Sequence, residues 1–223
     1  MEDGGSRNLY SYLKTHEMKR FPLGAAKAKS IIMQCMAGIC HMHLGPGIVH
    51  RDIKPENIVA CETPQGLRVK LCDFDLSAIM RPGRLCTSTV GTFPFMAPEL
   101  MDGKQYDPFA ADIWSMAIVF LEVLCSVRVV EKVATAGRKP ANWEETEDMT
   151  RDIRKFFAKP HGLKNLLDAH LRPELKGEID GTTQSLLKGM LHVQPSERWT
   201  AGAFALMFET GRIDAGSRDN SER

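Results

Sequence analysis

Apolar residues recur every three or four positions between Ala25 and Leu44, which is the spacing of one face of an α-helix. The pattern therefore predicts a long helix with one buried side. Gly45-Pro46-Gly47 follows directly and predicts the end of this helix, because glycine and proline disfavour its continuation. His41 and His43 lie near that end. We expect packing roles for both, because no cysteine or carboxylate completes a metal-ligand set with them.

A second helix is predicted from about Ala111 to Cys125, where apolar residues surround the helix on nearly every side. A helix of this kind is expected inside the core. Residues 126–147 carry no clear pattern and are expected to form a solvated connector. Further helical patterns cover residues 153–158, 163–171 and 183–191.

Two short strands are expected at residues 58–61 and 67–72, joined by a turn at residues 63–66. The predicted fold is therefore mainly α-helical with one small β-hairpin. The 223 residues and the 43% hydrophobic content suit a single domain, which we expect to cover residues 1–211. Residues 212–223 are polar and charged, and we expect them to form a disordered tail.

Composition excludes several classes of function. A net charge of +1 gives no reason to expect a nucleic-acid or membrane surface. The longest apolar run, from Ile113 to Cys125, is too short to span a bilayer and contains Glu122. The six cysteines show no C-x-x-C spacing, and the start of the chain does not resemble a signal peptide. We expect an intracellular, cytoplasmic protein with reduced thiols.

The stretch from His50 to Asn57, His-Arg-Asp-Ile-Lys-Pro-Glu-Asn, carries candidate chemistry. Asp52 can accept a proton from an attacking hydroxyl group. Sixteen residues after Asn57 comes Asp73, and the side chains of Asn57 and Asp73 can hold Mg²⁺ against the phosphates of a nucleotide. The alternative is a loop of charge pairs without any chemistry.

These two motifs resemble those of the eukaryotic protein kinases, and the resemblance covers the large lobe, roughly from Gly4 to Gly211. It implies binding of ATP and Mg²⁺, and a protein substrate that carries a serine or threonine. Lys54, two residues after Asp52, resembles the serine/threonine kinases and would neutralise charge on the transferred phosphoryl group. Val59 would form part of the floor beneath the adenine ring.

The resemblance also implies a regulatory segment that begins at Asp73-Phe74-Asp75 and ends at Ala97-Pro98-Glu99. Thr87, Ser88 and Thr89 would be the sites where an upstream kinase adds an activating phosphate, with Arg51 as its receptor. Thr92 would hold Asp52 and Lys54 in place.

Other residues would support this site. By the same resemblance, His50 and Phe74 would stack on each other, and Asp112 would accept backbone N–H bonds from the catalytic loop. Arg198 would pair with Glu99, as suits the planar fork of a guanidinium group.

The sequence departs from the family in three respects. Asp75 replaces the usual glycine, whose backbone reaches angles that other residues reach less easily. This D-F-D motif resembles that of the MAP-kinase-interacting kinases, a branch of the calmodulin-dependent-kinase-like set. Asn8 stands where kinases of basic substrates often carry an acid, although Glu56 could still contact a substrate arginine. The sequence shows no glycine-rich loop, no lysine-bearing strand and no helix that offers a glutamate to that lysine, so the small lobe is expected to be absent.

Three functions remain open. The first is a protein serine/threonine kinase whose large lobe is this chain. The second is a catalytically inactive, kinase-like interaction module. The third is a small-molecule phosphotransferase with a kinase-like fold, against which the expected Glu99–Arg198 pair and Thr92 argue.

Overall fold

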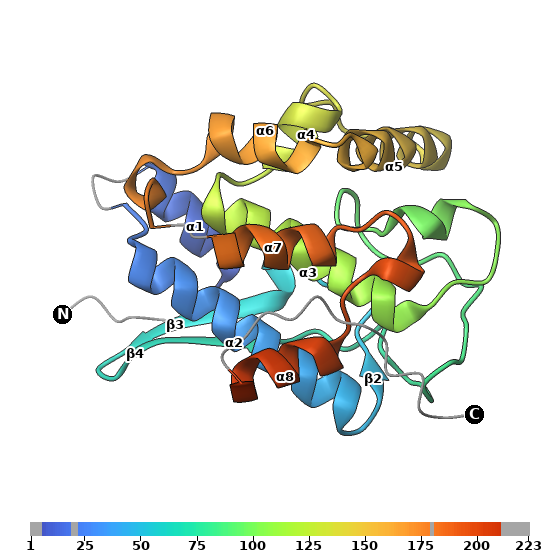
Figure 1. Ribbon diagram of the computed structural model, residues 1–223, viewed down its shortest axis with the longest axis horizontal. Coiled ribbons are helices and arrows are strands. Elements are labelled where there is room, and N and C mark those ends of the chain that lie inside the picture. The colour runs from blue at the N-terminus through green and yellow to red at the C-terminus, as the bar shows by residue number, and fades with distance from the viewer. Residues whose placement is uncertain (1–5, 19–21, 179–180, 211–223) are drawn as a thin grey trace.

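The computed structural model describes residues 6–18, 22–178 and 181–210 (Figure 1). Gly4, where the resemblance to a kinase large lobe begins, and the tail expected at residues 212–223 lie outside these ranges. The helices and strands, in chain order, are β1 (Arg7–Asn8), α1 (Leu9–Met18), α2 (Ala25–Leu44), β2 (Ile48–Val49), β3 (Ile58–Thr63), β4 (Gly66–Leu71), β5 (Ala78–Ile79), α3 (Pro108–Leu124), α4 (Val129–Ala134), α5 (Trp143–Ala158), α6 (Gly162–His170), α7 (Gly181–Met190) and α8 (Ala201–Thr210).

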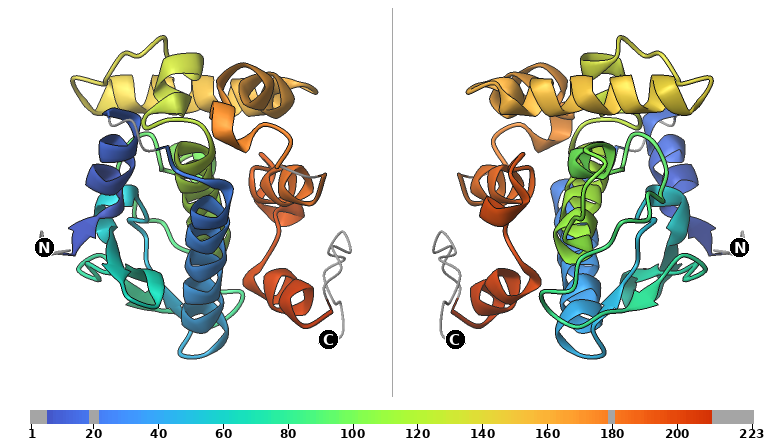
Figure 2. Two further views of the ribbon diagram at one scale, coloured as in Figure 1. Left: turned by 90° about the vertical axis from the view of Figure 1, so that its left-hand side faces the viewer. Right: turned by 90° about the vertical axis from the view of Figure 1, so that its right-hand side faces the viewer.

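Helices α2 and α3 stand side by side at the centre, with the strands on one side and α7 and α8 on the other (Figure 2). The predicted long helix is confirmed, and it ends before Gly45, whose N–H donates to the His41 carbonyl. Helix α3 begins three residues before the predicted Ala111, because the Asp107 carboxylate caps it by accepting from the N–H groups of Phe109 and Ala110.

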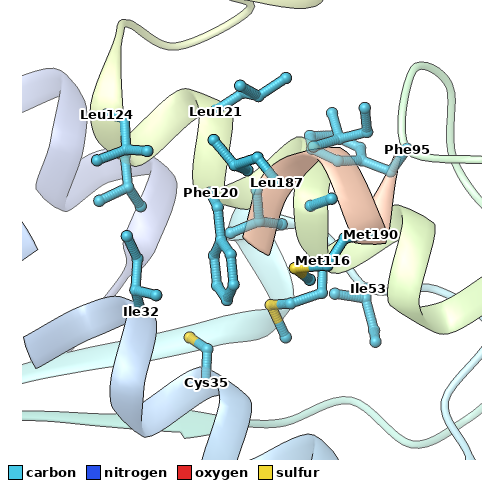
Figure 3. Close-up of a cluster of buried hydrophobic side chains, with 14 of the residues drawn as sticks. Ile32, Cys35, Ile53, Phe95, Met116, Phe120, Leu121, Leu124, Leu187 and Met190 are labelled. Atoms are coloured by element: carbon cyan, nitrogen blue, oxygen red, sulfur yellow. The ribbon is translucent and has the colours of Figure 1, made fainter. Parts of the chain in front are cut away.

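The core forms where α2, α3 and α7 meet (Figure 3). Nearly every residue of α3 is buried, as its continuous apolar sequence predicts. Burial of each large apolar side chain stabilises the fold by roughly 1.5–3 kcal/mol. The residues of this cluster include Ile32, Cys35, Met116, Phe120, Leu187 and Met190.

The predicted β-hairpin is confirmed as β3 and β4, whose register pairs Ile58 with Leu71 and Thr63 with Gly66. No third strand was predicted beside it. Strand β1 pairs with β3 and makes a three-stranded sheet, in the order β1-β3-β4. A second small sheet pairs β2 with β5. Strands of two residues leave no alternation in the sequence, so the hydrophobic pattern could not reveal them.

The region expected to be a connector, residues 126–147, is partly helical. It contains α4, and α5 begins in it at Trp143, ten residues before the predicted start at Ile153. Asn142 caps α5 by accepting from the N–H of Glu145. Most of the first turns of α5 are charged and exposed, which hid the helix from a search for apolar spacing.

Two further expectations concern redox state and membranes. All six cysteines are free in the structure. None of the helices within the described residues is both long enough and apolar enough to cross a membrane.

Candidate active site

The loop from His50 to Asn57 is anchored to the core by Asp112 of α3. The Asp112 carboxylate, 1% exposed, accepts from the backbone N–H groups of His50 (2.7 Å) and Arg51 (2.8 Å). Nε2 of His43 lies 3.0 Å from the same carboxylate. Arg51 takes a left-handed backbone conformation, with φ of 67°, which costs energy for a non-glycine residue. The bonds to Asp112 hold the loop in this shape.

Three side chains converge on the carboxylate of Asp52. Lys54 Nζ donates to Oδ2 (2.7 Å), Thr92 Oγ1 donates to Oδ1 (2.7 Å), and Asn57 Nδ2 donates to Oδ2 (3.1 Å). Lys54 also donates to Thr92 Oγ1 (2.9 Å). The carboxylate is therefore held in one orientation by donors on both of its oxygens. The structure brings together Asp52, Lys54, Asn57 and Thr92, four residues that the sequence singled out.

The side chains of Asp73 and Asn57 offer oxygen ligands. Asp73 lies two residues after the end of β4, and it is exposed. Asn57 spends Nδ2 on its bonds to Asp52, which leaves Oδ1 for a cation. Among the described residues, no group of three His, Cys, Asp or Glu side chains could hold a metal ion. Two oxygen ligands still fit Mg²⁺, which keeps several waters and binds phosphate oxygens as well.

Asp75 stands where the family usually has glycine, yet the left-handed backbone of this motif lies at Asp73. Asp73 is the residue of this motif with positive φ, 63°, whereas Asp75 lies in a turn closed by the bond from Ser77 N–H to the Phe74 carbonyl (3.0 Å). An aspartate is accepted at position 75 because the backbone there does not enter the left-handed region.

Phe74 packs on His50, with ring centroids 5.0 Å apart and an angle of 43° between the planes. His50 is fully buried, and its Nε2 lies 3.0 Å from the Cys72 carbonyl. Phe74 is 45% exposed on its other side. Val59 lies in β3 opposite Lys70 and is half-buried, whereas its neighbours Ile58 and Ala60 point into the core. Val59 thus lies on the sheet face that points away from the core.

The segment after Asp73 contacts the catalytic loop through Arg51. The Arg51 guanidinium donates to Ser88 Oγ (2.9 Å) and to the Leu76 carbonyl (2.6 Å). The Tyr106 hydroxyl donates to the Ser88 carbonyl (2.7 Å). Thr89 donates instead to the Leu100 carbonyl (3.4 Å), and Thr87 is exposed. Of the three candidate regulatory residues, Ser88 is the one in contact with Arg51.

Glu99 and Arg198 form a buried pair below this segment. Arg198 donates from Nη1 to Oε1 (2.6 Å) and from Nη2 to Oε2 (3.0 Å) of Glu99. Arg198 donates further to the Ala110 and His192 carbonyls, so its guanidinium joins the segment end to α3 and to the chain after α7. The residues after β5 are therefore tied to the core at this end.

Comparison with known sequences decides the family. The protein kinase domain family matches residues 1–207. The chain belongs to the protein kinase family. SNF-related serine/threonine-protein kinase of Rattus norvegicus is 37% identical over 182 residues, which cover 79% of this chain and 22% of that protein. Calcium-dependent protein kinase 14 of Arabidopsis thaliana is 32% identical over 163 residues, which cover 73% of this chain and 26% of that protein.

A third relative, cyclin-dependent kinase-like 4 of Homo sapiens, is 40% identical over 113 residues, covering 49% of this chain and 28% of that protein. The kinase chain thus spans between about a fifth and under a third of the length of these relatives. Of these three relatives, the SNF-related kinase is the one named as a serine/threonine-protein kinase.

The sequence did not predict an acidic pocket next to this site. A pocket of about 320 Å³ opens beside Thr92 and is lined by the carboxylates of Glu56, Glu122 and Glu131. Burial raises the pKa of Glu122 to about 8, although the Arg128 N–H opposes the shift. Burial also raises the pKa of Glu131. The available signal was a lone glutamate in the otherwise apolar run of α3.

Proposed function

We propose that this chain is the catalytic large lobe of a protein serine/threonine kinase, which transfers the γ-phosphoryl group of ATP to a serine or threonine hydroxyl of a protein. The observation that carries the proposal is the convergence of Lys54, Thr92 and Asn57 on the Asp52 carboxylate. A loop that merely balanced charge would not need a carboxylate oriented by donors on both oxygens.

Asp52 orients the substrate hydroxyl and takes its proton as the oxygen attacks the phosphoryl group. Lys54 lies 2.7 Å from Asp52 and neutralises charge on the transferred group. Thr92 bonds both side chains and so fixes their separation. The loop stays in position because Asp112 holds two of its N–H groups.

Asn57 and Asp73 would hold Mg²⁺, and Val59 would lie beneath the adenine ring. When bound, the ion neutralises phosphate charge. Amide and carboxylate oxygens are the ligand types that this ion prefers. We propose that a small lobe completes the nucleotide site, because phosphoryl transfer depends on positioning from both sides of the cleft. On this proposal, residues 1–223 alone bind nucleotide weakly.

A second candidate function is a non-catalytic interaction module. It is favoured by apolar side chains exposed near the site: Phe74 (45%), Leu76 (37%) and Ile79 (79%). Such a patch calls for a covering partner. Retention of the whole Asp52 cluster favours the kinase, because a binding surface has no physical need for it.

The test is to join this chain to the small lobe of the rat SNF-related kinase and incubate the product with Mg·ATP and serine peptides. The proposal expects peptides that gain one phosphoryl group, as detected by mass spectrometry. Asp73→Asn should lose most of this activity, and excess Mn²⁺ should partly restore it, because the substitution weakens the metal site. A well-folded hybrid without any transfer would favour the interaction module.

A further inference from the structure

The acidic pocket beside Thr92 already contains a cation of the chain itself. Arg128 lies between α3 and α4 and lines the pocket together with Glu122 and Glu131. Its backbone N–H donates to Glu122 Oε1 (2.9 Å), and its Nε lies 3.8 Å from Glu131 Oε2. The guanidinium carbon sits 5.8 Å from the centre of the Tyr10 ring, in a cation–π arrangement.

The backbone at Arg128 is strained in a way that serves this placement. Its φ is 59° and its ψ is 28°, in the left-handed region that disfavours residues other than glycine. Nothing in the chain's chemistry requires an arginine at a left-handed position, where glycine or asparagine would cost less. The Arg128 side chain contacts Glu131 and Tyr10 from this position.

The pocket retains a buried polar atom without a partner. Glu122 is 2% exposed, and its Oε2 is buried without a hydrogen-bond partner among the described residues. A buried polar atom of this kind is costly unless a ligand or water satisfies it. Glu56, on the exposed side of the pocket, adds another carboxylate. The carboxylates of Glu56 and Glu131 thus suit a guanidinium or ammonium group, and the pocket opens beside Thr92, which bonds Asp52.

We propose that Arg128 is a resident cation that shields this pocket from cationic side chains of a substrate, and so sets the selectivity of the site against basic sequences. The pocket alone would attract arginine next to the acceptor hydroxyl. Arg128 already pairs with Glu131, so this carboxylate is not free to bind a substrate cation. Arg128 and Lys139, which also lines the pocket, would both repel such a cation. The claim that Arg128 disfavours basic substrates rests on the proposed kinase function. The claim that Arg128 occupies the pocket does not depend on that function.

The experiment measures binding of N-ethylguanidinium to residues 1–223 by NMR titration, with no need for catalysis. Arg128→Gly removes the guanidinium and relieves the left-handed backbone, so the fold should be kept. We expect this variant to bind N-ethylguanidinium at least about tenfold more tightly than the unmodified chain, as a regained charge-assisted bond implies. Resonances of Tyr10 and of the Glu131 side chain should shift.

Matched variants isolate the cause. Arg151→Gly removes an exposed arginine that pairs with Glu147 and Asp148 on α5, and it should leave binding unchanged. Arg128→Asn, which also tolerates a left-handed backbone, should behave like Arg128→Gly and guards against a folding defect particular to glycine. Adding Glu131→Gln to Arg128→Gly should return binding to the level of the unmodified chain.

Equal binding by the unmodified chain and both Arg128 variants would overturn the proposal. A measurement with peptide substrates then distinguishes failure of this proposal from failure of the proposed kinase function. In the hybrid kinase, Arg128→Gly should raise the ratio of rates for arginine-flanked over alanine-flanked serine peptides about tenfold. Loss of a preference for glutamate-flanked peptides in that variant, with no gain for arginine, would show that Arg128 binds acidic substrates directly and would also overturn the proposal.

Discussion

Glu99 and Arg198 are separated by 99 positions in the chain, yet they form a bidentate ion pair with N–O distances of 2.6 and 3.0 Å. Both are buried, at 6% and 3% exposure. The pair joins the end of the segment that begins at Asp73 to the chain between α7 and α8. This link sets the position of the segment relative to the helical core.

Arg198→Leu should destabilise the fold by roughly 3–5 kcal/mol, because it leaves the Glu99 carboxylate buried without a counter-charge. The free energy of unfolding in urea is the measurement. Arg151→Leu makes the same chemical change at an exposed pair and should alter stability by less than about 1 kcal/mol. Similar losses of unfolding free energy in the two variants would show that the buried pair stabilises the fold no more than an exposed pair does.

Asp112→Asn should loosen the catalytic loop and cost about 1–3 kcal/mol of stability. An amide NH₂ cannot accept from the N–H groups of His50 and Arg51, so at least one of them loses its partner. Hydrogen exchange should accelerate at these two amides. Asp168→Asn, at an exposed ion pair with Lys164, is the control. Unchanged exchange at His50 and Arg51 would contradict the anchoring role.

Glu122 should make the protein less stable as pH rises. Its pKa is about 8 in the folded chain against an ordinary 4.5, so the folded state holds one more proton between these values. Stability contributed by this group is therefore greatest below pH 4.5 and is lost as pH rises through 8. Glu122→Gln removes this dependence, so the variant should lose less stability than the unmodified chain between pH 5 and pH 9. Parallel pH curves for the two proteins would contradict the shift.

Ser88 should be the main regulatory residue of its segment. In the hybrid kinase, Ser88→Ala should lower the activity obtained after treatment with an upstream kinase by about tenfold, because Arg51 loses its phosphate partner. Thr87→Ala, in the same exposed stretch, should have little effect. Full activity with alanine at residues 87, 88 and 89 together would refute a phosphate switch in this segment.

The two central helices could be predicted from the sequence because each has an apolar pattern with clear signals at its ends. For α2 these are Gly45-Pro46-Gly47, and for α3 the boundary shifted only because Asp107 supplies the cap. The Asp52 cluster was readable because its members lie in linked motifs. Strand β1 could not be predicted, because it forms through pairing with β3 and is too short to show an apolar pattern. The start of α5 could not be predicted either, because its first turns are charged.

The acidic pocket shows the other limit. Glu122 was visible as a charge in an apolar helix, yet its meaning depends on Glu56, Glu131 and Arg128, which only the fold brings together. Likewise, no local signal showed that the left-handed residue of the D-F-D motif is Asp73 rather than Asp75. Tertiary contacts determine the backbone angles and the residues that line a pocket, so neither can be predicted from the spacing of residues in the sequence alone.

The most direct test of the central claim is single-turnover phosphoryl transfer by the hybrid kinase with Asp52→Asn. The substitution keeps size and removes the charge that orients the hydroxyl and takes its proton, so the rate should fall by roughly 10²–10⁴-fold while the thermal midpoint changes little. A rate within a few-fold of the unmodified hybrid would contradict the assignment of Asp52 as the base and, with it, the catalytic role of the loop from His50 to Asn57.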